Sequence, residues 1–166
     1  APMSFATIAD NLLLAAIQQH LKTASIPAEH FRLQVEAAAL ARDPGASMAF
    51  AQIVKRAGMG LVINNESAET LEPALMRMLP CDYYKVPATH LGSLRKAVYM
   101  AHGVDMSVIA TGVENCEMFA TLWSENVDYM QGDYLCPPMP VPDYPFADEQ
   151  ELSSDTLAAP TWSVNR

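Results

Sequence analysis

The stretch Val108-Ile-Ala-Thr-Gly-Val-Glu114 is followed, one helix-like segment later, by Asp128-Tyr-Met-Gln-Gly-Asp-Tyr134. In both stretches a short run typical of a β-strand ends in a polar residue and a glycine. Asn115 is a suitable cap for the helix between them, which we expect to end near Glu125. Two strands joined by a crossover helix predict a parallel pair.

The same alternation of strand-like and helix-like segments runs through most of the chain. Asp43 and Pro44 supply a cap and a first-turn proline for one helix, which Gly58 ends. We expect strands over residues 31–36, 60–65, 82–86, 106–111 and 128–131, and further helices over residues 11–24, 69–78 and 91–102, the first capped by Asp10. Five strand-helix units in a row predict an α/β fold with a mostly parallel sheet.

The last part of the chain breaks this alternation. Five prolines between Cys136 and Pro145 exclude a regular helix or strand there. We expect one domain over residues 1–146, with a packed loop near its end, and an acidic, flexible tail over residues 147–166. The apolar side chains of Phe119, Leu122 and Trp123 fall on one helical face, which we expect to pack against the sheet.

Composition restricts the classes of protein to consider. A chain of 166 residues with 51% hydrophobic and 17% charged residues can fill one core. No apolar run approaches the roughly 20 residues that span a bilayer and no signal peptide is recognisable, so we expect a cytoplasmic protein without a membrane partner. The three cysteines lack CxxC spacing and the four histidines lack HxH or HxxxH spacing, so we expect free thiols, no zinc site and no cofactor.

Charge is distributed unevenly. Residues 97–165 contain eleven acidic residues and no lysine or arginine, whereas residues 1–96 contain nine basic and eight acidic residues. Binding of nucleic acid polymers needs several cations on one face to neutralise phosphates, and this distribution argues against it.

The opening stretches resemble the last two strands of the EAL-domain family, which hydrolyses or senses cyclic di-GMP. The family usually has Ala-Glu-Gly-Val-Glu in the first of them, and Thr111 stands at the position of its metal-binding glutamate. The resemblance implies a TIM-barrel-like fold that is incomplete here, with about five of eight parallel strands and without the Glu-Ala-Leu strand. Pro2 falls at the position of a metal-binding asparagine.

Other positions that hold metal ions in the family are changed as well. Its Glu-Ile-Thr-Glu is matched by Gln34-Val-Glu-Ala37, and its Asp-Asp-Phe-Gly by Asn64-Asn-Glu-Ser67. The lysine of Lys-Ile-Asp is retained as Lys85, but Pro87 replaces the aspartate. A two-cation reaction needs several carboxylate oxygens, so we expect no phosphodiesterase activity.

A single cation held by Glu36 or Glu66 is an alternative, with a solvated carboxylate as the competing interpretation. Glu36 is expected to face away from Gln34. Lys85 suits either a phosphate or a neighbouring carboxylate. Glu114 suits either a guanine contact or a buried residue that helps to cap the next helix.

Closer resemblance lies in residues 120–135 and 142–146, which are similar to FimX-type regulators of type IV pili. That group carries degenerate EAL domains, which bind cyclic di-GMP without cleaving it and dock PilZ-type partners. The resemblance implies a ligand site formed from nine residues: Gln34, Asn64, Asn65, Lys85, Thr111, Val113, Glu114, Gln131 and Gly132. It also implies a protein partner, either a PilZ-type domain or a second copy. The alternative function is a scaffold that no longer binds cyclic di-GMP and acts only through protein contacts.

Overall fold

The computed structural model describes residues 11–66, 71–89, 91–138 and 140. Our expectations for Pro2, for the Asp10 cap and for residues 141–166 lie outside this range. Among the helices of the described residues, none is both long and apolar enough to cross a bilayer.

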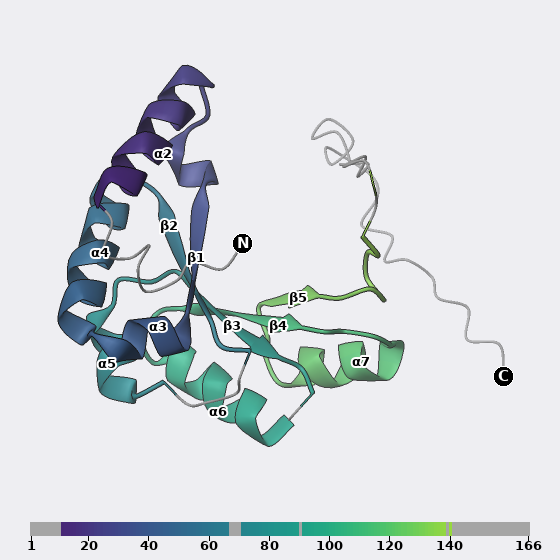
Figure 1. The fold of residues 1–166 in the computed structure, drawn as a ribbon. Helices are drawn as coiled ribbons and strands as arrows, with labels where there is room; N and C mark the ends of the chain where they lie inside the picture. The colour runs from purple at the N-terminus through teal and green to yellow at the C-terminus, as the bar shows by residue number, and fades with distance from the viewer. Residues whose placement is uncertain (1–10, 67–70, 90, 139, 141–166) are drawn as a thin grey trace, which may run out of the picture.

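Five parallel strands form one sheet, in which the spatial order of the strands follows the chain. They are β1 (Arg32–Glu36), β2 (Gly60–Asn64), β3 (Tyr83–Pro87), β4 (Ser107–Thr111) and β5 (Tyr129–Gln131). The helices are α2 (Asn11–Thr23), the 3-10 turn η1 (Ala28–His30), α3 (Ala37–Arg42), α4 (Pro44–Arg56), α5 (Pro73–Met78), α6 (Leu91–His102) and α7 (Cys116–Ser124). Helices α4, α5, α6 and α7 follow the convex side of the sheet (Figure 1).

The α/β prediction is confirmed, and each predicted strand is present within one or two residues of its expected bounds. Two helices differ from expectation. Helix α3 was missed because its six residues are too few for a periodic pattern and no side chain caps its N-terminus. Helix α5 begins at Pro73, later than predicted, since proline is favoured in the first helical turn.

The two faces of the sheet differ in burial. In β1, β3 and β4, fully buried residues alternate with half-buried or exposed ones. The buried set, which includes Val35, Tyr84 and Val108, belongs to the core shared with the helices. Strand β2 differs, because it is buried on both faces beyond its first residue. The core therefore lies on the convex side, and the polar side chains lie on the concave side.

Two aspartates next to strand starts tie neighbouring strands together in the same way. The Asp82 carboxylate accepts a hydrogen bond from the Leu61 amide at 2.8 Å and pairs with the Lys55 ammonium at 2.6 Å. The Asp128 carboxylate accepts from the Val108 amide at 2.7 Å and lies 2.8 Å from His102 Nε2.

These interactions affect the titration of Asp128. Burial acts to raise its pKa, but the hydrogen bonds from the Val108 amide and the His102 imidazole outweigh burial, so the pKa lies below its ordinary value. The carboxylate therefore stays charged, and it holds the start of β5 against β4.

The packing predicted for Trp123 is wrong. Leu122 is 1% exposed, whereas Trp123 is 72% exposed and stacks on the partly exposed Phe119 with ring centroids 6.3 Å apart. Adjacent helical positions point about 100° apart, so Leu122 and Trp123 cannot share one narrow contact with the sheet. Leu122 faces the sheet and takes the buried position.

Candidate ligand site at the carboxyl ends of the strands

A first row of paired residues crosses the sheet where the strands end. Glu36 of β1 pairs with Asn64 of β2, which pairs with Lys85 of β3. Paired residues project to the same face of a sheet, so all three side chains lie on the concave side. Gln34, two residues before Glu36, lies on that side too, and both are half-buried. Our expectation that Glu36 faces away from Gln34 was wrong, because residues two apart on a strand share a face.

A second row lies one step further along the strands. Pro87 of β3 pairs with Thr111 of β4, which pairs with Gln131 of β5. Because Pro87 is two residues from Lys85, this row is also on the concave side. Four of the nine predicted site residues therefore lie at the carboxyl edge of one face: Asn64, Lys85, Thr111 and Gln131. A fifth, Gln34, lies on the same face in the middle of β1, where it pairs with Val62.

Asn64 and Glu36 interact directly. Asn64 Nδ2 donates a hydrogen bond to Glu36 Oε1 at 2.7 Å, and the Asn64 side chain is 1% exposed. Asn64 Oδ1 has no hydrogen-bond partner among the described residues. The amide thus orients the one carboxylate of the first row, and Glu36 is not a freely solvated group.

Asn65 lies apart from the rest of the predicted site. Its Nδ2 donates to the Tyr84 hydroxyl at 2.8 Å, and Tyr84 belongs to the buried core. Burial raises the pKa of Tyr84, although hydrogen bonds with Asn65 and the Leu71 backbone act in the opposite direction. Asn65 is therefore directed toward the helices, away from the row that contains Asn64.

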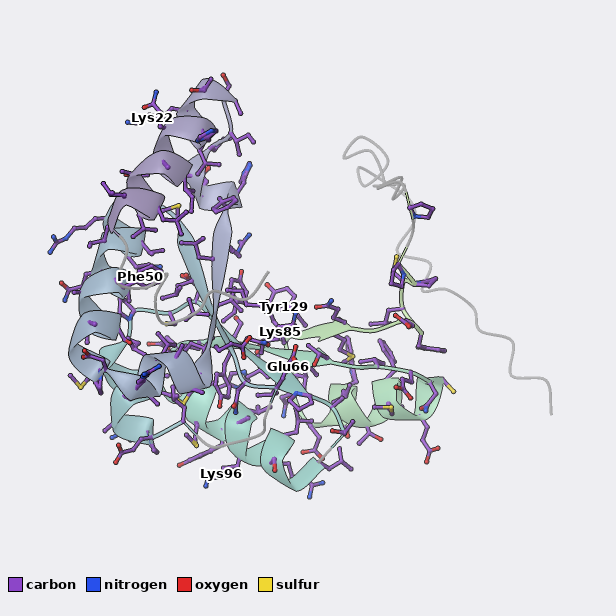
Figure 2. All side chains as sticks on the ribbon, in the orientation of Figure 1. Lys22, Phe50, Glu66, Lys85, Lys96 and Tyr129 are labelled. Atoms are coloured by element: carbon purple, nitrogen blue, oxygen red, sulfur yellow. The ribbon has the colours of Figure 1, made fainter. Side chains whose placement is uncertain are left out.

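Lys85 reaches the concave side in the middle of the sheet (Figure 2). Within the described part of the chain it forms no ion pair, so the neighbouring-carboxylate alternative finds no support there. Glu66, the alternative cation ligand, follows the end of β2 and is exposed. An unpaired ammonium beside a polar row can bind a phosphate.

The Thr111 hydroxyl is already engaged. Its Oγ1 donates to the Val86 carbonyl at 3.4 Å, and the Thr111 carbonyl accepts from the Ala88 amide at 2.8 Å. Thr111 therefore ties β4 to the end of β3. It offers a neutral hydroxyl where the resemblance placed a glutamate.

Glu114 is exposed, contrary to the alternative in which it is buried next to the helix. The cap of α7 is Asn115, whose Oδ1 accepts from the Met118 amide at 2.9 Å. Glu114 forms no hydrogen bond or ion pair with other described side chains. Its carboxylate is consequently available to a ligand at the same edge of the sheet.

Val113 and Gly132 are the two predicted site residues without a polar side chain, so they can interact with a ligand only through the backbone or by packing. Val113 is fully buried, and its amide donates to the Gln131 carbonyl at 3.1 Å, while its carbonyl accepts from the Tyr134 amide at 3.1 Å. Val113 therefore has no free polar group for a ligand. Gln131 has an exposed side chain next to this contact.

Two tyrosines and an arginine on the concave side were not singled out from the sequence. Tyr83 and Tyr129 meet edge to face with ring centroids 5.7 Å apart, and the Arg32 guanidinium lies 5.1 Å from the Tyr83 ring centre. Tyr129 pairs with Ile109, which pairs with Lys85, so Tyr129 lies two strands away from Lys85 on the same face. The sequence did contain a signal for these tyrosines. Residues two apart on a strand share a face, so Tyr83 is on the face of Lys85 and Tyr129 is on the face of Gln131.

Comparison with known proteins identifies the fold family. A family model described as the EAL domain matches residues 2–138. The chain belongs to the EAL domain family. Comparison with curated proteins finds no match.

Several solved EAL domains have a similar fold. The PaMucR phosphodiesterase in complex with c-di-GMP has a TM-score of 0.78 and 20% identity, over 84% of this chain and 61% of that one. The FimX EAL domain from Pseudomonas aeruginosa bound to c-di-GMP has a TM-score of 0.78 and 22% identity, over 87% and 64%. The Xanthomonas citri FimX EAL domain in complex with c-di-GMP has a TM-score of 0.76 and 18% identity, over 88% and 62%. This EAL chain thus spans less than two-thirds of the length of each.

Proposed function

We propose that this EAL chain binds cyclic di-GMP without hydrolysing it and transmits the bound state to a protein partner. The observation that carries the proposal is the availability of Glu114, Gln131 and Lys85 at one edge of the sheet. A carboxylate and an amide oxygen can accept hydrogen bonds from a guanine edge, and an unpaired ammonium can meet a phosphate. Three solved structures with this fold are described as c-di-GMP complexes.

The donor atoms at the strand ends support the loss of catalysis. Amides and a hydroxyl stand at Gln34, Asn64, Asn65 and Thr111, and they are weaker ligands for hard divalent cations than carboxylates. Two of these groups are engaged elsewhere, Asn65 with Tyr84 and Thr111 with Val86. The described residues hold no group of three or more His, Cys, Asp or Glu side chains suited to a metal ion. These residues do not fit a pair of divalent cations.

The binding proposal predicts saturable heat in a calorimetric titration of the 166-residue chain with cyclic di-GMP. Glu114→Ala should weaken binding about tenfold or more, because a hydrogen bond to a charged group contributes roughly 1.5–3 kcal/mol. Glu117→Ala is the matched control, since Glu117 is an exposed glutamate in the first turn of α7. Absence of saturable binding at micromolar concentrations, or equal losses in the two variants, would contradict the proposal.

The loss of catalysis predicts no hydrolysis with Mg²⁺ or Mn²⁺. Incubation of the chain with cyclic di-GMP and either cation should yield no linear dinucleotide above a sample without protein, as measured by chromatography. An active phosphodiesterase of the same family serves as the positive control. A linear product that appears with either cation and disappears on chelation would refute the inactive assignment.

A protein scaffold without a ligand is the second candidate function. Strands β1 and β5 are the two edges of the sheet, and neither pairs with a further strand of the described residues. Open strand edges are surfaces for association with another chain. Under this alternative the titration gives no binding, while a PilZ-type domain or a second copy still associates. From the resemblance to FimX-type regulators, we further propose a role in type IV pilus or motility control.

A further inference from the structure

Gly132 follows β5 directly and lies against the backbone of the loop after β4. A Cβ atom at Gly132 would lie 2.2 Å from the Val113 carbonyl oxygen and 2.3 Å from the Val113 nitrogen. Real Cβ atoms do not approach backbone atoms this closely, and backbone cannot rotate away as a flexible side chain can. The contact therefore requires glycine.

The same loop is held by hydrogen bonds on both sides of that contact. The Val113 amide donates to the Gln131 carbonyl, and the Val113 carbonyl accepts from the Tyr134 amide. These two hydrogen bonds fix the loop to residues 131–134 on the β5 side. On the other side, the Ala88 amide donates to the Thr111 carbonyl. Gly112 has a φ of +74°, a conformation that favours glycine, and it turns the chain between these two attachments.

The position of Glu114 follows from this arrangement. Val113 is fully buried and its amide and carbonyl are both occupied, while the next side chain, Glu114, is exposed. One residue later, Asn115 fixes the start of α7. Glu114 therefore projects from a backbone that is anchored immediately before and after it.

We infer that Gly132 is a positioning residue, which holds the Val113 backbone and thereby sets Glu114 beside Gln131 as one rigid pair of ligand contacts. Fixed contacts bind more tightly because less conformational freedom is lost on association. The ligand part of this inference rests on the proposed function. The anchoring part does not.

Gly132→Ala is the direct test, and Gly92→Ala is its matched control, because a Cβ at Gly92 would meet nothing within 4 Å. In folded Gly132→Ala protein with an unchanged circular dichroism spectrum, we expect affinity for cyclic di-GMP to fall at least tenfold. Gly92→Ala should bind as the unmodified chain does. Equal affinity of the two variants would overturn the positioning role.

Hydrogen exchange of the unmodified chain tests the anchoring without the ligand and without a substitution. The amides of Val113 and Tyr134 should exchange at least tenfold more slowly than that of Glu114, which donates to no backbone carbonyl of the described residues. If they exchange as fast as Glu114, the inference fails even when cyclic di-GMP binds. If they are protected but no ligand binds, the proposed function fails and the anchoring stands.

Discussion

Leu122→Ala is expected to lower the free energy of unfolding by about 3 kcal/mol, within the range of roughly 2–5 kcal/mol for buried leucines. Leu122 is the fully buried side chain of α7 and is 1% exposed. Its removal leaves a cavity between the helix and the sheet. Chemical denaturation followed by circular dichroism measures the change.

Trp123→Ala is the control at the next position along the helix. Trp123 is 72% exposed, and its contact is the stacked ring of Phe119. Loss of an exposed aromatic contact should cost less than about 1 kcal/mol, although tryptophan is the larger residue. If Trp123→Ala destabilises the chain more than Leu122→Ala, the packing of α7 described above is incorrect.

This pair of residues illustrates what the sequence could and could not predict. Apolar residues spaced along a helix predict that one face is buried, and they rightly predicted a helix after Asn115. They do not specify which of two adjacent apolar residues lies at the centre of that face. A rotation of the helix by about 100° exchanges them, and only packing against the sheet decides.

The candidate site, like the packing of α7, was predictable only in part from the sequence. The resemblance indicated Asn64, Lys85, Thr111 and Gln131, and the register brings these residues to one edge. The direction of Asn65 was not predictable, because it follows the last residue of β2 and its partner is the distant Tyr84. The hydrogen bond between Glu36 and Asn64 depends on the register of β1 and β2, and the residue pattern of each strand alone does not specify that register.

Interactions through the backbone were the hardest to predict. Gly132 was singled out as a ligand contact, and a Cβ atom added there would meet the Val113 backbone. Side-chain chemistry guides the choice of site residues from a sequence, and glycine has no side chain. The role of such a residue becomes visible only when the surrounding backbone is in place.

Cys81 is expected to react with iodoacetamide at least a thousandfold more slowly than Cys116 and Cys136 in the folded chain at pH 8. All three cysteines are free, but Cys81 is buried and the other two are exposed. Burial raises the pKa of the Cys81 thiol to about 12, and the neighbouring Asp82 carboxylate adds to the increase against the opposing effect of Lys55. The thiolate is the reactive form, and at pH 8 only about one Cys81 thiol in 10,000 is ionised.

The pH dependence of this reaction separates ionisation from simple lack of access. Since pH 8 to 10 lies well below the raised pKa, each pH unit should increase the Cys81 thiolate, and with it the labelling rate, about tenfold without levelling off. Mass spectrometry of peptides after timed labelling gives the rate at each cysteine, and labelling in denaturant provides the control, because burial is then removed. A Cys81 rate in the folded chain that equals those of Cys116 and Cys136 would mean that the start of β3 is open to solvent. The packing of Asp82 against Lys55 and the Leu61 amide would then not hold in solution.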